Sequence, residues 1–212
     1  MVADGPVWAV VVAAGSGDRY GAPKQYERLG DRRVLDWSLA AARSVADGVV
    51  VVVSSARGTD PEPGADVVVV GGATRSASVR AGLAAVPGDA AVVVVHDAAR
   101  PAATPALFAA VVAAVRAGAD GAVPGVAVVD TVKRVADGVV VETLDRTTLV
   151  AVQTPQAFRA TVLRAAHAGE DEATDDGALV ESAGGRVVVV PGEPANVKLT
   201  TPADLDRLAA SR

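Results

Sequence analysis

The fold of this chain is decided by Val7-Trp8-Ala9-Val10-Val11-Val12-Ala13-Ala14-Gly15-Ser16-Gly17, an apolar run that leads directly into a glycine-rich turn. The β-branched content of the run predicts a buried strand. A glycine-rich turn after a strand exposes consecutive backbone N–H groups, and such a concavity binds anions. Two cations, Arg19 and Lys24, follow the turn, and Pro23 stiffens the backbone beside the lysine. The stretch therefore predicts a phosphate-binding loop whose added cations act on a phosphate that changes charge during a reaction.

Two common glycine-rich nucleotide motifs do not fit this spacing. A Walker A loop needs a glycine followed by lysine, and no glycine in this chain is followed by lysine. A dinucleotide fingerprint needs its third glycine where this chain has Tyr20, and the glycine comes one residue later, at Gly21. It also needs an acidic residue where the second predicted strand ends in Ser54-Ser55. The alternative to a phosphate-binding loop is a tight surface turn whose nearby charges have no function.

Composition and charge narrow the class of protein. The chain has 212 residues, 50% hydrophobic but only 3% aromatic, so its core must consist of Val, Ala and Leu. This length suits one α/β domain, here residues 1–212. No segment reaches the ~18 apolar residues of a membrane span, and the N-terminus lacks a signal-peptide pattern. A net charge of −5 without a basic stripe argues against nucleic-acid binding, and the absence of cysteine leads us to expect a cytoplasmic protein.

Valine-rich runs alternate with helical stretches, which predicts a Rossmann-like, mostly parallel sheet with helices on both faces. The predicted strands are Val7–Ala14, Val49–Ser54, Val67–Val70, Ala91–Val95, Gly121–Val129, Leu149–Val152 and Arg186–Val190. The predicted helices are Val34–Val45, Arg75–Val86, Thr104–Ala117, Ala160–Ala168, Asp175–Ala183 and Pro202–Ala210. Thr104-Pro105 and Thr201-Pro202 each place a capping hydroxyl before a proline at the first helical position.

One segment, at about residues 128–148, departs from this alternation. Residues 131–135 and 139–143 read as a β-hairpin that turns at Asp137-Gly138. Isolated hairpins are marginal in water. We therefore expect a projecting arm whose valine face packs against another subunit, although the spacing also allows it to fold back on its own domain.

Polar clusters follow several of the predicted strands. Asp97 comes where a buried strand ends, and a carboxylate at that edge is well placed to hold Mg²⁺ beside a phosphate loop. The alternative is that Asp97 caps a turn and pairs with Arg100. The neighbouring His96 is more consistent with a structural histidine than with a general base. Lys198 also follows a strand and can reach the same edge, unless it is a solvated loop lysine.

Two further clusters are weaker on their own. Gly71-Gly72-Ala73-Thr74-Arg75-Ser76-Ala77-Ser78 follows a strand and begins a helix. Its small residues would let a planar base approach the backbone, where Arg75 or Ser78 could contact it. Asp145-Arg146, beyond the hairpin, is a lone charged pair, and most such pairs are merely solvated.

Characteristic motifs extend over nearly the whole chain: AAGSGDRYGAPKQY, GGATRSASVRAGL, HDAARP, DTVKR, LDRTTL, TPQAF, TDDGALVE and NVKLTTPADL. The first alone indicates only the wider nucleotidyltransferase group. The combination of HDAARP, DTVKR, TPQ and N-x-K-x-T is more specific. Together the motifs resemble those of the 2-C-methyl-D-erythritol 4-phosphate cytidylyltransferases of isoprenoid precursor synthesis.

The resemblance implies roles for individual residues. Arg19 and Lys24 would bind the CTP triphosphate and stabilise the transition state, Asp97 would bind Mg²⁺, and Lys198 would bind the reacting phosphates. The residues implied to enclose the nucleotide are Ala13, Ala14, Gly15, Gly17, Gly72, Arg75 and Ser78. Those implied to hold methylerythritol phosphate are Arg100, Thr131 and Arg146, the last two supplied by the arm of the partner in a homodimer. Ala73 and Ala195 depart from the family pattern, because family members often have acidic residues there.

The implied reaction is transfer of CMP from CTP to 2-C-methyl-D-erythritol 4-phosphate with release of pyrophosphate. The attacking phosphate monoester, with a second pKa of ~6, is already largely anionic and needs no strong base. A related enzyme acting on another polyol phosphate, such as ribitol 5-phosphate, is the nearest alternative. A non-catalytic nucleotide-binding regulator is a second, and a nicotinamide-dependent dehydrogenase is disfavoured by the failed fingerprint.

Overall fold

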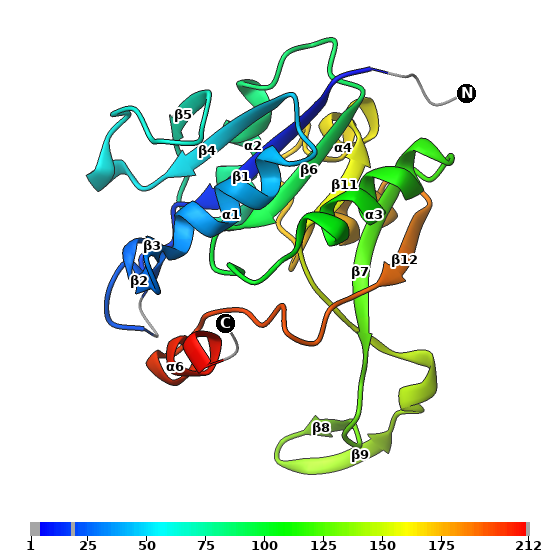
Figure 1. Cartoon of the computed structure of the whole chain (residues 1–212). Coiled ribbons are helices and arrows are strands. Elements are labelled where there is room, and N and C mark those ends of the chain that lie inside the picture. The colour runs from blue at the N-terminus through cyan, green and yellow to red at the C-terminus, as the bar shows by residue number, and fades with distance from the viewer. Residues whose placement is uncertain (1–4, 18–19, 211–212) are drawn as a thin grey trace.

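The computed structural model describes residues 5–17 and 20–210, and its centre is one eight-stranded sheet (Figure 1). The strand order is β10-β7-β11-β6-β1-β4-β5, and β12 pairs with β7. Four neighbouring strands are parallel: β6 (Val92–Asp97), β1 (Val7–Ala13), β4 (Gly48–Val53) and β5 (Val67–Val70). Their carboxyl ends therefore meet at one edge of the sheet, which is where ligands bind in open α/β folds.

The other half of the sheet is mixed. β7 (Gly121–Ala127) is parallel to β12 (Val187–Pro191) and antiparallel to β10 (Val150–Val152). β11 (Gln156–Arg159) lies antiparallel between β6 and β7. The sheet is thus mostly parallel, as the sequence predicts, with two short antiparallel strands.

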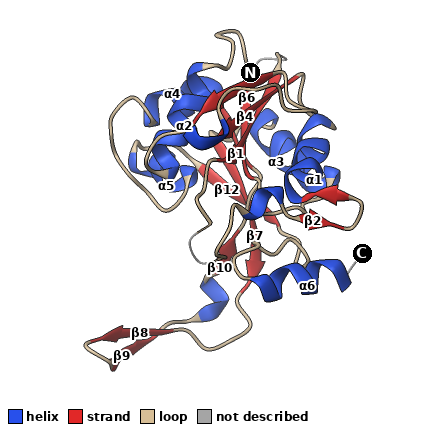
Figure 2. Ribbon diagram, turned by 90° about the vertical axis from the view of Figure 1, so that its left-hand side faces the viewer, coloured by secondary structure: helices blue, strands red, loops and turns tan. Residues whose placement is uncertain are grey.

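Helices cover both faces of the sheet (Figure 2). One face carries α1 (Val34–Arg43) and α3 (Pro105–Arg116), and the other carries α2 (Arg75–Ala84), α4 (Ala160–Ala166) and α5 (Asp176–Ser182). Side chains alternate between the two faces, so Val11 of β1 packs toward α1 and α3 while Val10 packs toward α2. All residues of β4 and β6 are buried, which explains why these strands read as unbroken apolar runs.

The predicted strands and helices are present, and their ends differ from prediction by two residues or fewer. Two very short strands, β2 (Arg28–Leu29) and β3 (Arg32–Arg33), were not predicted, and neither was β11. Thr104 caps α3 as expected, because its hydroxyl oxygen accepts the Leu107 N–H at 3.2 Å. α6 (Pro202–Ala210) begins at the predicted residue, directly after Thr201. The Thr201 hydroxyl donates to the Asp204 carboxylate at 2.9 Å, and that carboxylate accepts the Thr201 N–H at 2.8 Å.

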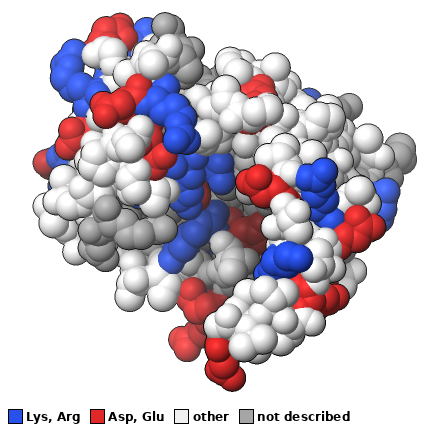
Figure 3. Space-filling model, turned by 90° about the horizontal axis from the view of Figure 1, so that it is seen from below, with Lys and Arg blue, Asp and Glu red and all other residues white. Residues whose placement is uncertain are grey.

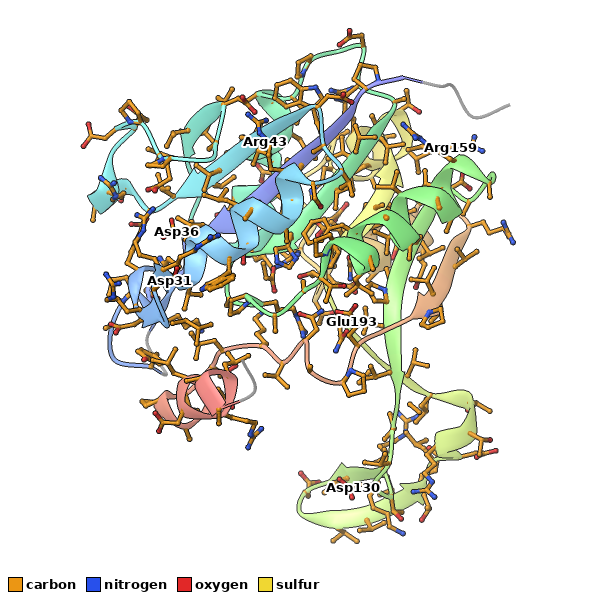
Figure 4. All side chains as sticks on the ribbon, in the orientation of Figure 1. Asp31, Asp36, Arg43, Asp130, Arg159 and Glu193 are labelled. Atoms are coloured by element: carbon orange, nitrogen blue, oxygen red, sulfur yellow. The ribbon has the colours of Figure 1, made fainter. Side chains whose placement is uncertain are left out.

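The hairpin is present and projects from the body of the molecule (Figures 1 and 2). It consists of β8 (Lys133–Ala136) and β9 (Val139–Thr143), paired antiparallel. Asp137 and Gly138 both have positive φ, 50° and 80°, as a tight hairpin turn requires. Every residue of both strands is exposed. Figure 4 places Asp130 on this arm, apart from Glu193 beneath the sheet.

Valines give the arm an apolar surface in the single chain. Its exposed members are Val129, Val135, Val139, Val140 and Val141, each more than half exposed. Within residues 5–17 and 20–210, no helix is long and apolar enough to cross a membrane.

Candidate active site

A pocket of about 480 Å³ opens at the carboxyl ends of the parallel strands. Four segments and one lysine line it: residues 12–17, residues 24–25, residues 72–75 with Ser78, residues 97–99, and Lys198. Seen from below in Figure 3, basic and acidic side chains meet around a hollow on this face of the molecule. The loops that the sequence predicts to converge therefore do so.

The glycine-rich loop folds back on itself at Gly17. The Gly17 carbonyl accepts the N–H groups of Tyr20 and Gly21 at 2.7 and 2.8 Å. Gly17 has a φ of 78°, and a Cβ there would lie only 1.8 Å from the Ala22 carbonyl oxygen, so glycine is required. The return of the chain brings Lys24, at the start of the short 3₁₀ helix η1 (Lys24–Tyr26), to the pocket wall. Arg19, the other predicted triphosphate ligand, lies outside the described residues.

Asp97 ends β6 at the floor of the pocket and contacts two cations. Its Oδ2 is 2.6 Å from Lys198 Nζ, and its Oδ1 is 3.1 Å from Arg75 Nε. Burial alone would raise the pKa of the Asp97 carboxyl, but Arg75 and Lys198 outweigh it and hold that pKa well below its usual range. The carboxylate is therefore fully ionised at neutral pH.

Arg75 is fixed from two sides. Besides Asp97, its guanidinium Nη2 lies 2.8 Å from Oδ2 of Asp176, a fully buried carboxylate on α5. Asp176 in turn lies 3.0 Å from Nε2 of His167. The sequence analysis predicts that Arg75 helps to enclose the nucleotide, and Arg75 does line the pocket. Its guanidinium, however, already pairs with two carboxylates.

The start of α2 also lines the pocket. The Thr74 hydroxyl oxygen caps the helix by accepting the Ala77 N–H at 3.0 Å. The Ser78 hydroxyl donates to the Thr74 carbonyl at 2.9 Å. A Cβ on Gly72 would lie 2.5 Å from the Ala77 Cβ, so the backbone here requires glycine. Gly72 and Ser78 both line the pocket, and their contact with the base stays a prediction.

A profile of the family described as IspD, 2-C-methyl-D-erythritol 4-phosphate cytidylyltransferase, matches residues 7–211. The chain belongs to this family. It is 50% identical over 218 residues to the 2-C-methyl-D-erythritol 4-phosphate cytidylyltransferase of Nocardia farcinica, covering 97% of this chain and 93% of the relative.

Solved structures of the same family have this fold. The enzyme of that name from Thermus thermophilus superimposes with a TM-score of 0.81 at 36% identity, over 95% of this chain and 96% of that one. The 4-diphosphocytidyl-2C-methyl-D-erythritol synthase from Anaerococcus prevotii gives a TM-score of 0.83 at 30% identity, over 98% of each chain.

Asp97 is the carboxylate of this pocket that could hold a Mg²⁺ ion. Mg²⁺ commonly takes one or two carboxylates together with phosphate oxygens. Asp97 supplies one ionised carboxylate beside the glycine-rich loop. Within the described ranges, 5–17 and 20–210, the pocket included, no group of three or more His, Asp or Glu side chains is arranged to hold a metal ion.

The predicted acceptor residues are not brought together in the single chain. Arg100 Nη1 donates to the Asn196 carbonyl at 2.7 Å, near the loop that bears Lys198. The Arg100 backbone N–H donates to the Asp97 carbonyl at 3.0 Å, so the expected turn at Asp97 is present. The Asp97 carboxylate, however, pairs with Arg75 and Lys198 rather than with Arg100. Thr131 and Arg146 are exposed on the arm, where the Arg146 guanidinium donates to the Val129 carbonyl.

His96 is a core residue rather than a base at the pocket. It is fully buried, its ring centroid lies 4.9 Å from that of Phe108, and its Nδ1 lies 3.2 Å from the Thr154 hydroxyl. Burial lowers the pKa of His96 to about 4. This environment supports the structural role that the sequence analysis favours for His96.

Sequence reasoning missed several polar residues that hold the site together. Gln25 hydrogen-bonds to the glycine-rich loop, Asp176 holds Arg75, and Gln153 with Asn196 anchors the loop before Lys198. Gln153 Nε2 donates to the Glu193 carbonyl at 2.8 Å, and Asn196 Nδ2 donates to the Thr154 carbonyl at 2.9 Å. Gln25, Asp176 and Asn196 lie inside motifs quoted above and Gln153 directly precedes one, but sequence alone does not distinguish such polar residues from solvated ones.

Proposed function

We propose that this chain transfers CMP from CTP to 2-C-methyl-D-erythritol 4-phosphate, releasing pyrophosphate and forming CDP-methylerythritol in the non-mevalonate route to isoprenoid precursors. The observation that carries the proposal is the single pocket that joins the glycine-rich loop, Lys24, Asp97 and Lys198 in a chain of this family. Such a pocket suits a reaction between polyanions, in which positioning and charge stabilisation supply the catalysis.

The chemical step needs no covalent nucleophile from the protein. A phosphate oxygen of the acceptor attacks the α-phosphorus of CTP and forms a new P–O bond. The bond from that phosphorus to the bridging oxygen of the β-phosphate breaks, and the electron pair leaves with pyrophosphate. Because the attacking phosphate is already anionic at neutral pH, no general base is required. The buried, neutral His96 is consistent with this.

Each part of the pocket has a distinct task in this proposal. Backbone N–H groups of residues 13–17 bind the triphosphate, while Lys24 and Arg19 neutralise the charge that moves to the leaving pyrophosphate. Lys198 lies where it can contact the reacting phosphates, and Arg75 holds Asp97 in place. Gly72 and Ser78 receive the cytosine. Asp97 would hold a Mg²⁺ ion, which would supply positive charge to offset that of the phosphates.

We propose that the acceptor site is completed by a second copy of the chain. Arg100 is supplied from the body, and Thr131 with Arg146 from the arm of the partner. The exposed valines of the arm support a homodimer, because isolated hairpins rarely persist with such a face in water. The chain is then a single domain, residues 1–212, with a dimerisation arm at about 128–148. The lack of cysteine supports a cytoplasmic location.

A turnover screen tests the proposal. Pyrophosphate release is measured with each of the four nucleoside triphosphates, against methylerythritol phosphate and ribitol 5-phosphate, with and without Mg²⁺. We expect turnover with CTP and methylerythritol phosphate that depends on the metal. Preference for ribitol 5-phosphate would assign another polyol cytidylyltransferase, and CTP binding without pyrophosphate release from either acceptor would indicate a regulator.

A further inference from the structure

Gln25 is a buried side chain beside the catalytic lysine that the reaction outlined above does not use. It is 4% exposed and lies in the 3₁₀ helix η1, directly after Lys24. Its Nε2 donates to the Ala13 carbonyl at 2.8 Å and to the Gly15 carbonyl at 3.2 Å. A side-chain amide nitrogen has two N–H donors, so both are used on the glycine-rich loop.

These two hydrogen bonds orient the loop. In a trans peptide the carbonyl of one residue and the N–H of the next point in opposite directions. Holding the Ala13 and Gly15 carbonyls toward Gln25 therefore turns the N–H groups of Ala14 and Ser16 away from it. Ala14 and Ser16 both line the pocket. If these carbonyls were released, their partially negative oxygens could turn toward the triphosphate and repel it.

The backbone of Gln25 is itself held firmly. The Tyr26 N–H donates to the Pro23 carbonyl at 3.0 Å, and the Glu27 N–H donates to the Lys24 carbonyl at 3.1 Å. The Tyr26 side chain packs against the core cluster between the sheet and helices α1 and α3. The amide of Gln25 thus connects a fixed turn, which bears Lys24, to a glycine-rich loop that has little intrinsic stiffness.

We propose that Gln25 is a positioning residue for CTP: it turns the loop N–H groups toward the phosphates and fixes their spacing from Lys24. The inference rests on the proposed use of this loop for the triphosphate. Both donors of the Gln25 amide are used on the glycine-rich loop, so its loss should affect CTP far more than methylerythritol phosphate.

Two substitutions separate the hydrogen bonds from the volume of the side chain. Gln25→Leu keeps a similar volume and removes both donors. Gln25→Glu keeps the shape but places a carboxylate against two carbonyl oxygens. Since each hydrogen bond contributes on the order of 1 kcal/mol, we expect the KM for CTP and the CTP dissociation constant to rise about tenfold or more in both variants. The KM for methylerythritol phosphate should change by less than about twofold.

The glutamate variant adds a signature that a purely structural role would not give. A protonated carboxylic acid can donate one of the two lost hydrogen bonds, and burial raises the pKa of such an acid. The CTP affinity of Gln25→Glu, divided by that of the wild type at the same pH, should therefore improve as the pH is lowered from 8 toward 6. Gln25→Leu should show no such recovery.

The control is Tyr26→Phe, which alters the same turn without touching the loop carbonyls and should leave the KM for CTP unchanged. CTP binding is measured by calorimetry without acceptor, in parallel with turnover and thermal unfolding. Failure of the wild type to turn over CTP would overturn the proposed function, not the role of Gln25 in CTP binding. An unchanged CTP affinity in both variants, or equal losses for CTP and acceptor accompanied by a large drop in Tm, would overturn the inference.

Discussion

Replacing Lys198 by methionine gives the sharpest test of how this site works. Methionine keeps an unbranched apolar stem and removes only the ammonium group, which lies 2.6 Å from Asp97 Oδ2. If Lys198 acts on the reacting phosphates, the substitution should reduce turnover strongly while the fold stays intact. If Lys198 serves only to neutralise Asp97, it should chiefly affect stability.

The structure sets the size of both effects. The Lys198 side chain is 40% exposed, and Arg75 continues to pair with Asp97 after the substitution, so the free energy of unfolding should fall by only about 1 kcal/mol. For a chain of this length that corresponds to a Tm shift of about 2–4 °C. A cation placed where charge develops in the transition state contributes about 3–4 kcal/mol. Its loss should lower kcat/KM about 10²–10³-fold.

Pyrophosphate release at saturating acceptor, together with calorimetric unfolding, measures the two effects on the same preparation. Arg116→Met is the matched control, because it removes one positive charge from the exposed last turn of α3 and should leave turnover unchanged. A loss of kcat/KM below about tenfold in Lys198→Met would refute a role on the phosphates. A Tm drop well beyond a few degrees would show instead that the Asp97 pair is needed for folding.

Four further outcomes are expected. Lys24→Ala should lower turnover by orders of magnitude without changing the circular dichroism spectrum, and near-normal turnover would remove Lys24 from the mechanism. Arg146→Ala should raise the KM for methylerythritol phosphate more than that for CTP, whereas equal shifts would contradict an acceptor site at the arm. Val140 is 55% exposed in the single chain, so we expect a charge there to leave the fold intact. Val140→Asp should therefore give a monomer in sedimentation velocity experiments, and a persistent dimer would place the interface elsewhere. Burial lowers the pKa of His96 to about 4 from its usual 6.5, so the unfolded chain binds the proton more readily and the free energy of unfolding should fall as the pH drops from 6.5 to 4. The His96 ring proton resonance should accordingly stay at its neutral position at pH 5.5, and an NMR midpoint above pH 6 would contradict this environment.

Complete burial makes some elements easy to predict from the sequence. β4 and β6 are covered on both faces, so their valine runs are unbroken and can be recognised by composition alone. β11 escaped prediction because it is only four residues long and contains Gln156 and Arg159 at its ends. Its position between β6 and β7 is a property of the assembled sheet, to which its local sequence gives no periodic signal.

In the candidate site, sequence predicts which residues come together but not which side chains pair. Topology alone brings the loops after parallel strands to one edge, so Lys24, Asp97 and Lys198 could be placed together from sequence. The partners of individual side chains could not. Asp97 binds Arg75 rather than Arg100, since α2 starts beside the end of β6 and directs the Arg75 guanidinium between two carboxylates. That geometry depends on the packing of α5, which residue spacing does not reveal.

The proposed acceptor site is different in kind, because it would need residues from a second copy of the chain. Loops on the body of a single chain line the nucleotide pocket, whereas Thr131 and Arg146 are exposed on an arm that extends away from it (Figure 2). A chain deprived of its partner should therefore still bind CTP with undiminished affinity and yet fail to use methylerythritol phosphate. Measuring CTP affinity and turnover of methylerythritol phosphate on Val140→Asp separates the two halves of the site. A parallel loss of CTP binding would mean that the arm also shapes the nucleotide pocket. The exposed valines of β9 would then affect nucleotide binding as well as the dimer contact.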